Sequence, residues 1–476
     1  MKSPSKRPVV VIAGATGFVG KALISALRSH YRLICLTRGQ IDESNVFCNP
    51  DITWRQCDLF SLIDAEKALG CADYAFYLVH SMMPSARLTQ GSFEDMDLIM
   101  ADNFARAASL NGIKQIIYLG GLVPDKGKKL SLHLRSRLEV EKTLGSYGVP
   151  VTALRAGLII GAEGSTFRIL VRLVERMRFM VLPKWMYSLT HPISLSDVIE
   201  IMRYCLGNPF TFNQSFDIGG PDVMTYHDMV KKIAEVMGYK RHILTIPFFS
   251  SKLAGLLLSL FTNSPKSLVA PLVESIKTPM VAGNLRLQNE MSLPGMSFDK
   301  SVKLALSIKS GVNERTTPRK KSKKLSKQNN VMSVRSVQRL PLPGGIDADW
   351  VALHYSTWLP GLFKTFIKVK VDYKGCYFYF RFLRKSLLDL TFSHDRSSKD
   401  RPLYYITGGL LARLNLLPHK GRFEFREVLD NKYVLAAIHD YVPTIPWFIY
   451  NLTQARLHIW VMHKFGKHLT QINGNQ

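Results

Sequence analysis

The chain begins with an apolar strand that runs directly into a glycine-rich loop and then into a helix. Residues 8–13 are Pro-Val-Val-Val-Ile-Ala, and apolar residues recur at helical spacing over 21–28. The loop between them is Gly14-Ala15-Thr16-Gly17-Phe18-Val19-Gly20. A strand, a tight glycine turn and a helix N-terminus present free backbone N–H groups and a helix dipole to a phosphate. The pattern therefore predicts a dinucleotide site, the alternative being an ordinary strand–turn–helix.

The glycine spacing, GxxGxxG in place of GxGxxG, resembles that of the extended and atypical short-chain dehydrogenase/reductase (SDR) superfamily. The resemblance implies an α/β fold with a doubly wound parallel sheet. The next predicted strand, 32–37, is followed by Arg38, and no acidic residue occurs before Asp42. An acidic residue near this point would select NAD by binding the ribose 2′-hydroxyl, whereas an arginine can meet a 2′-phosphate. We therefore expect NADP(H) to be favoured over NAD(H), unless Arg38 is only a solvated loop charge.

Further strands alternate with helical segments, as expected of a doubly wound parallel sheet. The run 52–57 precedes Asp58 and Leu59, at the position where the resemblance implies a contact with the adenine amine. The run 73–79 precedes His80 at the cofactor side of the sheet. The predicted cofactor-binding residues are Gly14, Ala15, Thr16, Gly17, Phe18, Val19, Gly20, Arg38, Asp58, Leu59, Leu78, Val79, His80 and Arg137.

The catalytic positions depart from the SDR pattern of a Ser after the fifth strand and a Tyr-x-x-x-Lys on the next helix. The strand at 115–119 ends in Gly120-Gly121, and the resemblance aligns His133 with the Tyr and Arg137 with the Lys. A His can shuttle protons near neutral pH, so His133 is the candidate catalytic residue. Arg137 keeps its charge and can bind ribose or phosphate. The alternative is that both are ordinary exposed helix residues.

The resemblance continues through three landmarks, at 149–161, 191–198 and 216–226. The most similar families are NmrA-like regulators, the nucleotide-binding accessory subunit of respiratory complex I, and bacterial two-part proteins with an SDR half and an uncharacterised C-terminal domain. Several of these bind NADP(H) as a structural or sensing ligand without turning it over.

Composition limits the other possibilities. The 476 residues carry a formal net charge of +27, with a basic peak at 315–327. Such a segment is either a solvated linker or one that suits an anionic membrane surface. The six cysteines are scattered, with no metal-like spacing, and no motif for specific nucleic-acid recognition occurs. We expect no metal, no signal peptide and no membrane-spanning helix, although the apolar runs 246–261 and 442–465 could be either buried or interfacial helices.

These features predict four segments: an SDR-like Rossmann domain with a substrate-side lobe at 7–240, a helical apolar extension at 241–312, a basic linker at 313–332, and an α+β domain at 333–476. The last contains strand-like runs near 369–380, 387–392, 402–407, 422–428 and 433–438, followed by a long helix. Its weak resemblance to the tail of the two-part proteins implies a helix-grip fold with a cavity for an apolar ligand.

Two function classes remain open. The protein is either an NADP(H)-dependent oxidoreductase or isomerase acting on a small apolar substrate, or a non-catalytic cofactor-binding redox sensor or scaffold of a membrane-associated complex. We expect a cytoplasmic protein, with peripheral attachment at the inner face of the membrane as an alternative. The sequence does not indicate the oligomeric state.

Overall fold

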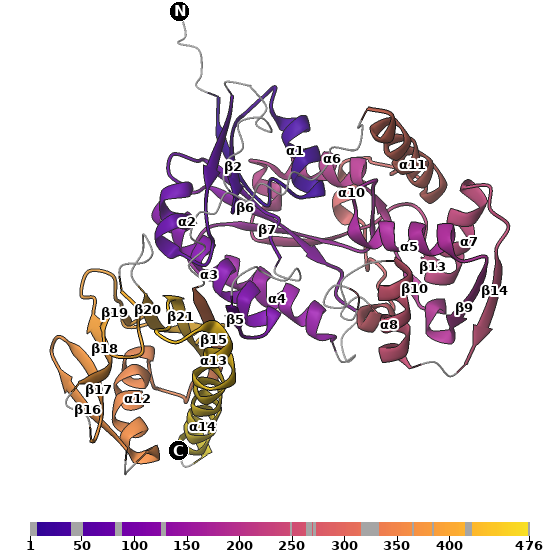
Figure 1. Cartoon of the computed structure of the whole chain (residues 1–476). Coiled ribbons are helices and arrows are strands. Elements are labelled where there is room, and N and C mark those ends of the chain that lie inside the picture. The colour runs from indigo at the N-terminus through magenta and orange to yellow at the C-terminus, as the bar shows by residue number, and fades with distance from the viewer. Residues whose placement is uncertain are drawn as a thin grey trace, which may run out of the picture. The chain divides into compact units, whose positions relative to one another are not determined.

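A computed structural model describes residues 7–39, 51–80, 88–124, 130–247, 250–262, 269, 273–315, 333–363, 366–382, 385–414 and 421–474. The chain divides into two units. Unit 1 comprises Met1–Met83 and Met100–Ser322, and unit 2 comprises Pro84–Ile99 and Lys323–Gln476 (Figure 1). Most of the predicted basic linker, together with Asp42, lies outside the described residues.

Unit 1 is built on a seven-stranded sheet in the order β12-β7-β6-β4-β1-β2-β3, in which every neighbouring pair is parallel. Its strands are β1 (Val9–Ala13), β2 (Arg32–Thr37), β3 (Ile52–Gln56), β4 (Tyr74–Tyr77), β6 (Gln115–Gly121), β7 (Val151–Ala156) and β12 (Gln214–Ile218). Strands β2 and β3 are added on one side of β1 and β4 on the other, and this reversal of strand order opens a crevice at the carboxyl ends of β1 and β4. The predicted doubly wound parallel sheet is confirmed.

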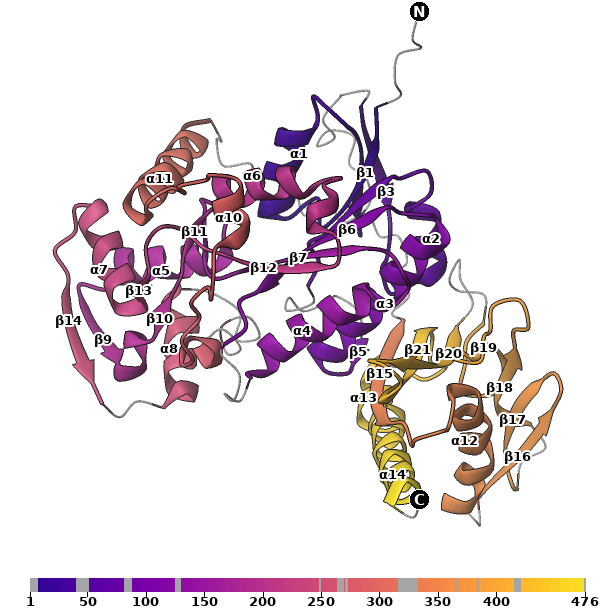
Figure 2. The ribbon, with the colours of Figure 1, turned by 180° about the vertical axis from the view of Figure 1, so that it is seen from behind.

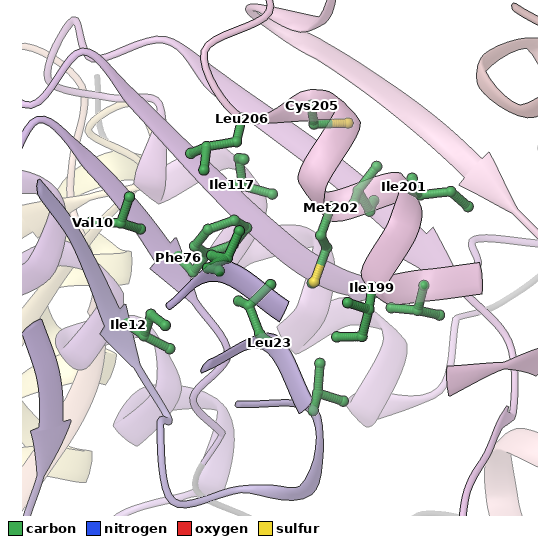
Figure 3. Packing of buried hydrophobic residues seen from close by; sticks show 14 of the residues in the cluster. Val10, Ile12, Leu23, Phe76, Ile117, Ile199, Ile201, Met202, Cys205 and Leu206 are labelled. Carbon is green, nitrogen blue, oxygen red and sulfur yellow. The ribbon is translucent and has the colours of Figure 1, made fainter. Parts of the chain in front are cut away.

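Helices cover both faces of this sheet. On one face α1 (Phe18–Leu27) and α6 (Leu195–Cys205) pack over the strands, and Figure 3 shows Leu23 and Met202 meeting Phe76 of β4. Consecutive strand residues point to opposite faces, so Tyr77 points the other way. Its ring packs edge-on against Phe104, with centroids 5.0 Å apart. Phe104 belongs to α3 (Phe93–Leu110), and α2 (Leu62–Ala68) and α4 (Leu132–Leu144) complete the helices of this part.

The remainder of unit 1 forms a lobe with its own apolar core, which includes Phe167, Val174, Met229, Ile233 and Val302. Its helices are α5 (Ser165–Arg176), α7 (Tyr226–Val236), α8 (Ser251–Thr262), α10 (Arg286–Glu290) and α11 (Phe298–Arg315), with 3₁₀ turns at Lys184–Tyr187 and Pro209–Thr211. Its short strands are β8 (Ile159–Ile160), β9 (Phe179–Pro183), β10 (Leu189–Thr190), β11 (Ile193–Ser194), β13 (Met224–Thr225) and β14 (His242–Ile246). The apolar run 246–261 thus supplies the end of β14 and most of α8.

Unit 2 contains a mixed eight-stranded sheet in the order β16-β17-β18-β19-β20-β21-β15-β5. The strands from the C-terminal part are β15 (Val334–Pro341), β16 (Ile367–Asp372), β17 (Gly375–Phe380), β18 (Ser386–Phe392), β19 (Leu403–Gly408), β20 (Arg422–Val428) and β21 (Tyr433–Tyr441). The helices are α12 (Ala348–Leu362), α13 (Trp447–Leu452) and the long α14 (Gln454–Gly474) (Figure 2). The predicted smaller α+β domain after the Rossmann domain is confirmed.

One strand of unit 2 comes from the N-terminal half of the chain. β5 (Leu88–Gln90) pairs in parallel with Val334–Ser336 of β15. Asp95 accepts a hydrogen bond from Arg339 at 2.7 Å, and the Gln90 amide donates to the Tyr450 hydroxyl at 3.2 Å. Residues 88–95, which the sequence analysis included in 7–240, therefore contribute both backbone and side-chain contacts to unit 2.

In the described parts of the chain, no helix is both long enough and apolar enough to cross a membrane.

Candidate functional site

The glycine loop forms a tight turn that leaves the start of α1 open. Gly14 has a positive φ of 90°, and a Cβ there would lie 2.9 Å from the carbonyl oxygen of Leu78. The Gly17 amide donates to the Gly14 carbonyl at 2.9 Å. Gly17 also caps α1, and as a glycine it offers no side-chain cap to the first amides of this helix. These amides and the helix dipole suit a phosphate group, so the residues present fit a dinucleotide.

A cavity of about 300 Å³ lies against this loop. Its walls come from the carboxyl ends of β1, β4, β6 and β7, from α4, and from the start of α5. Eight apolar side chains of Leu, Ile and Met contribute to the lining: Leu78, Leu119, Leu122, Leu134, Leu158, Ile159, Ile276 and Met280. The cavity therefore combines an anion-binding turn with an apolar chamber.

Nine of the residues singled out in the sequence lie on this wall: Gly14, Gly17, Phe18, Val19, Gly20, Leu78, His80, His133 and Arg137. Other predicted residues lie off it. Ala15 is fully buried, whereas Thr16 and Arg38 are exposed and Val79 is half-buried.

Asp58 and Leu59 also lie off the cavity wall. The Asp58 carboxylate accepts from the Phe60 amide at 3.3 Å, in the turn that leads to α2. The carbonyl of the buried Leu59 accepts from the Asn103 amide at 2.8 Å. Both residues thus shape the loop after β3.

Two histidines and an arginine set the electrostatics of the cavity. Burial, with Arg137 and His80 nearby, lowers the pKa of His133 to about 3. His80 lines the same cavity, and desolvation there, with Arg137 and Arg38 nearby, lowers its pKa to about 3. Both imidazoles are therefore neutral at pH 7, and the fixed positive charge belongs to the arginines.

The positions aligned with the SDR catalytic residues do come together. Gly121 at the end of β6 and both His133 and Arg137 on α4 line the same cavity. The Tyr118 hydroxyl donates to the Arg137 carbonyl at 3.1 Å, which ties α4 to β6. A Cβ on Gly121 would lie 3.5 Å from Leu134 and 3.9 Å from the Arg137 side chain, which are ordinary contact distances. The site thus has room for the usual serine but does not have its hydroxyl.

Sequence reasoning did not identify several wall residues from the lobe. Ser165 and Thr166 begin α5, whose N-cap Gly164 makes no side-chain cap, and Tyr226 and Ser275 line the wall as well. The landmark glycines at 157–161 lead into α5, so this motif could have indicated that Ser165 and Thr166 lie at the site. Ser275 belongs to no sequence motif, and only the tertiary fold brings it to the cavity wall.

The polar residues of the landmarks have structural partners. His191 Nε2 lies 2.7 Å from the Gly220 carbonyl, and its Nδ1 accepts from the Ala282 amide at 3.2 Å. Asp197 accepts from the Met296 amide at 2.8 Å, and Arg155 forms a two-pronged pair with Glu141. These contacts fix the lobe beside the sheet. In the described residues, no group of three or more His, Cys, Asp or Glu side chains is arranged to hold a metal ion.

Comparison with known proteins agrees with this geometry. Residues 10–178 match the model of the NAD dependent epimerase/dehydratase family. This part of the chain is therefore similar to that family. The chain is also similar in fold to a triphenylmethane reductase from Citrobacter sp., with 17% identity and a TM-score of 0.50 over 63% of this chain and 99% of the reductase. A nucleoside-diphosphate-sugar epimerase from Staphylococcus aureus is 14% identical, with a TM-score of 0.49 over 62% of this chain and 99% of the epimerase.

A curated relative is the auxiliary protein GraX of Staphylococcus aureus, which is 32% identical over 145 residues. The match covers 30% of this chain and 43% of GraX, so the chain spans less than half the length of that relative.

Proposed function

We propose that unit 1 binds NADPH and reduces a small, mainly apolar, electron-poor acceptor by hydride transfer. The observation that carries this proposal is one cavity that joins the glycine turn to an apolar chamber, with His133 and Arg137 on its wall. The NAD(P)-binding family supports the cofactor class.

Arg38 supports NADPH over NADH. It follows β2 directly, where an acidic residue would bind the ribose 2′-hydroxyl of NAD. The charge of Arg38, like that of Arg137, lowers the pKa of His80. Arg38 lies off the cavity wall, so the preference for the additional phosphate rests on its place directly after β2 and on its exposed charge.

The neutral state of His133 limits the chemistry that the site supports. When bound, NADPH would supply a hydride. A neutral imidazole can donate a hydrogen bond to an oxygen on which negative charge develops, but it does not carry the acidic proton of an imidazolium. General acid catalysis raises reaction rates by about 10²–10⁴-fold. Reduction of an ordinary ketone at this site would therefore be slower by that factor. The site is therefore best suited to electron-poor acceptors that need no proton from the protein in the same step.

A second candidate is a protein that binds NADP(H) without turning it over. Gly120, Gly121 and His133 place no hydroxyl where SDR enzymes have Ser and Tyr, and this favours a sensing or scaffolding role.

One experiment separates the two candidates. NADPH binding is measured by fluorescence titration, and oxidation of bound NADPH is then followed with malachite green, a cationic triphenylmethane dye, and with apolar ketones. Hydride transfer to the dye cation gives the neutral leuco dye and NADP⁺, with no proton required. Oxidation by the dye and little by the ketones supports the reductase. If NADPH binds but no acceptor oxidises it, the result supports the sensor. If the protein binds neither NADPH nor NADH, both candidate functions are refuted.

A further inference from the structure

Unit 2 has an open groove of about 440 Å³ between the end of β15 and α14. Three lining residues come from β15 and five from α14: Gln338, Arg339, Leu340, Arg456, Ile459, Trp460, Met462 and His463. On α14, Arg456, Trp460 and His463 follow one another at spacings of four and three residues, so they share one face of the helix. A guanidinium, an indole and an imidazole are thus presented to the same groove, whose volume lies in the range of small-molecule sites, about 300–1,000 Å³.

The groove has an apolar floor and an exposed aromatic wall. Leu340 and Met462 are buried. Ile459 and Trp460, in contrast, are each 43% exposed. The Trp460 ring also packs against Phe363, outside the groove, with centroids 6.0 Å apart, and this contact holds the indole in place. A large indole surface left open beside an apolar floor favours contact with a flat, apolar group.

The charged groups that line the groove are positive. Arg339 is engaged within the protein, because it donates to Asp95 at 2.7 Å. The Arg456 side chain is exposed and forms no hydrogen bond or ion pair with the part of the chain that the structure describes. No Asp or Glu is among the described lining residues, and none occurs in the sequence from 441 to 476. A free guanidinium without a competing carboxylate is suited to an anion, which it can hold with two parallel hydrogen bonds.

We propose that this groove binds a small aromatic carboxylate, whose ring packs on Trp460 and Ile459 and whose carboxylate pairs with Arg456. The two parts of such a ligand match the two parts of the groove. A carboxylate without the ring would gain only an exposed ion pair, which contributes little, and a ring without the charge would leave Arg456 unused. The groove shares no lining residue with the cavity of unit 1, so the proposal does not depend on the function proposed for that unit.

The test uses the full-length protein at pH 7 and two probes of one shape, 2-naphthoate and 2-naphthol, with binding measured by calorimetry. Arg456→Gln should weaken 2-naphthoate by about five- to tenfold and leave 2-naphthol unchanged, because only the carboxylate pairs with the guanidinium. Arg456→Lys, which keeps the charge but not the planar fork, should retain part of the affinity. The matched control is Lys467→Gln, which removes the same charge from an exposed position of α14 outside the groove and should have little effect.

Two further variants locate the ring of the probe. Trp460→Leu should weaken 2-naphthoate several-fold, because it removes the exposed aromatic wall. Leu388→Trp, which fills a separate apolar cavity of about 220 Å³ in unit 2, should leave 2-naphthoate binding unchanged. The proposal is overturned if the unmodified protein does not bind 2-naphthoate, or if Arg456→Gln weakens both probes equally. It is also overturned if the Arg456→Gln and Trp460→Leu variants bind 2-naphthoate as tightly as the unmodified protein, or if a folded Leu388→Trp variant no longer binds it.

Discussion

Alanine at two glycines of the nucleotide loop should separate folding stability from cofactor binding. A Cβ on Gly20 would lie 2.8 Å from Ala15 Cα and 2.9 Å from its carbonyl oxygen, and would overlap the Gly14 carbonyl. All three atoms are backbone, so α1 would have to move away from the turn. Overpacking costs about 1–3 kcal/mol, and alanine regains up to ~1 kcal/mol over glycine in a helix. We expect Gly20→Ala to lower the free energy of unfolding of unit 1 by a net amount of about 1–2 kcal/mol.

Gly17 lies in a different setting. Its φ of −74° suits any residue, and a Cβ there meets only the Gly14 carbonyl, at 3.1 Å. The position lines the cavity, so a methyl group would occupy space that a pyrophosphate needs. We expect Gly17→Ala to change stability by less than ~1 kcal/mol and to weaken NADPH binding by about tenfold, or ~1.4 kcal/mol.

Thermal unfolding and NADPH titration measure the two effects side by side. For Gly20→Ala the Tm should drop by roughly 2–8 °C, at about 2–4 °C for each kcal/mol. Gly255→Ala is the matched control, because Gly255 lies in α8 and a methyl group added there would meet none of the described atoms outside this helix within 4 Å. The reasoning fails if Gly20→Ala is as stable as the unmodified protein, or if Gly17→Ala binds NADPH with unchanged affinity.

Three further predictions concern ligands. Arg38→Ala should reduce the preference for NADPH over NADH in the same titration, and an unchanged ratio would remove Arg38 from the cofactor site. Arg137→Ala should weaken NADPH binding while His133→Ala leaves it nearly intact, because only the arginine offers a fixed charge to ribose or phosphate; two silent variants would contradict the assignment of α4. The basic segment 315–327 should support salt-sensitive sedimentation with vesicles of anionic lipid and little with neutral lipid, whereas protein that stays in the supernatant at low salt argues for a simple linker.

The sequence predicted the parallel sheet because its strands are short apolar runs separated by helical segments, a pattern that follows from burial on both faces. Strands β16 to β21 of unit 2 were likewise predicted as strand-like runs, whereas β15 (Val334–Pro341) was missed. β5 was not, because three residues carry no periodicity and its pairing with β15 spans more than two hundred residues. α12 was also missed, since Pro360 lies within it and obscures the helical pattern.

The candidate site was predictable only in part, for a related reason. The glycine turn is local, so Gly14 to Gly20 could be found from spacing alone. The chemistry of His133 depends instead on neighbours from other elements: His80 follows β4, and burial by the surrounding protein lowers the pKa of His133 to about 3. No sequence pattern states that the ring is neutral, yet this property decides which reactions the cavity supports.

A buried cluster of charges in unit 2 gives a final prediction, on stability and pH. The Glu424 carboxylate is 1% exposed and lies 2.7 Å from both Arg401 and Arg426 and 3.0 Å from His439 Nε2. Burial alone would raise the pKa of Glu424, but Arg401, Arg426 and His439 together hold it well below its usual range. A carboxyl whose pKa is lower in the folded state stabilises the fold above its unfolded pKa of about 4.3. That contribution is lost as the pH falls through the folded pKa.

Glu424→Gln keeps the shape of this side chain but removes the negative charge that Glu424 offers to two buried guanidinium groups, a change that costs about 3–5 kcal/mol. Urea unfolding at pH 7, followed by tryptophan fluorescence, should show this loss for unit 2. Asp395→Asn, at an exposed position, removes the same charge and should have little effect. Below about pH 4 the difference between Glu424→Gln and the unmodified protein should narrow, because protonation of Glu424 removes the same charge. A difference that stays constant from pH 7 down to pH 3 would show that packing, rather than the carboxylate charge, holds this cluster together.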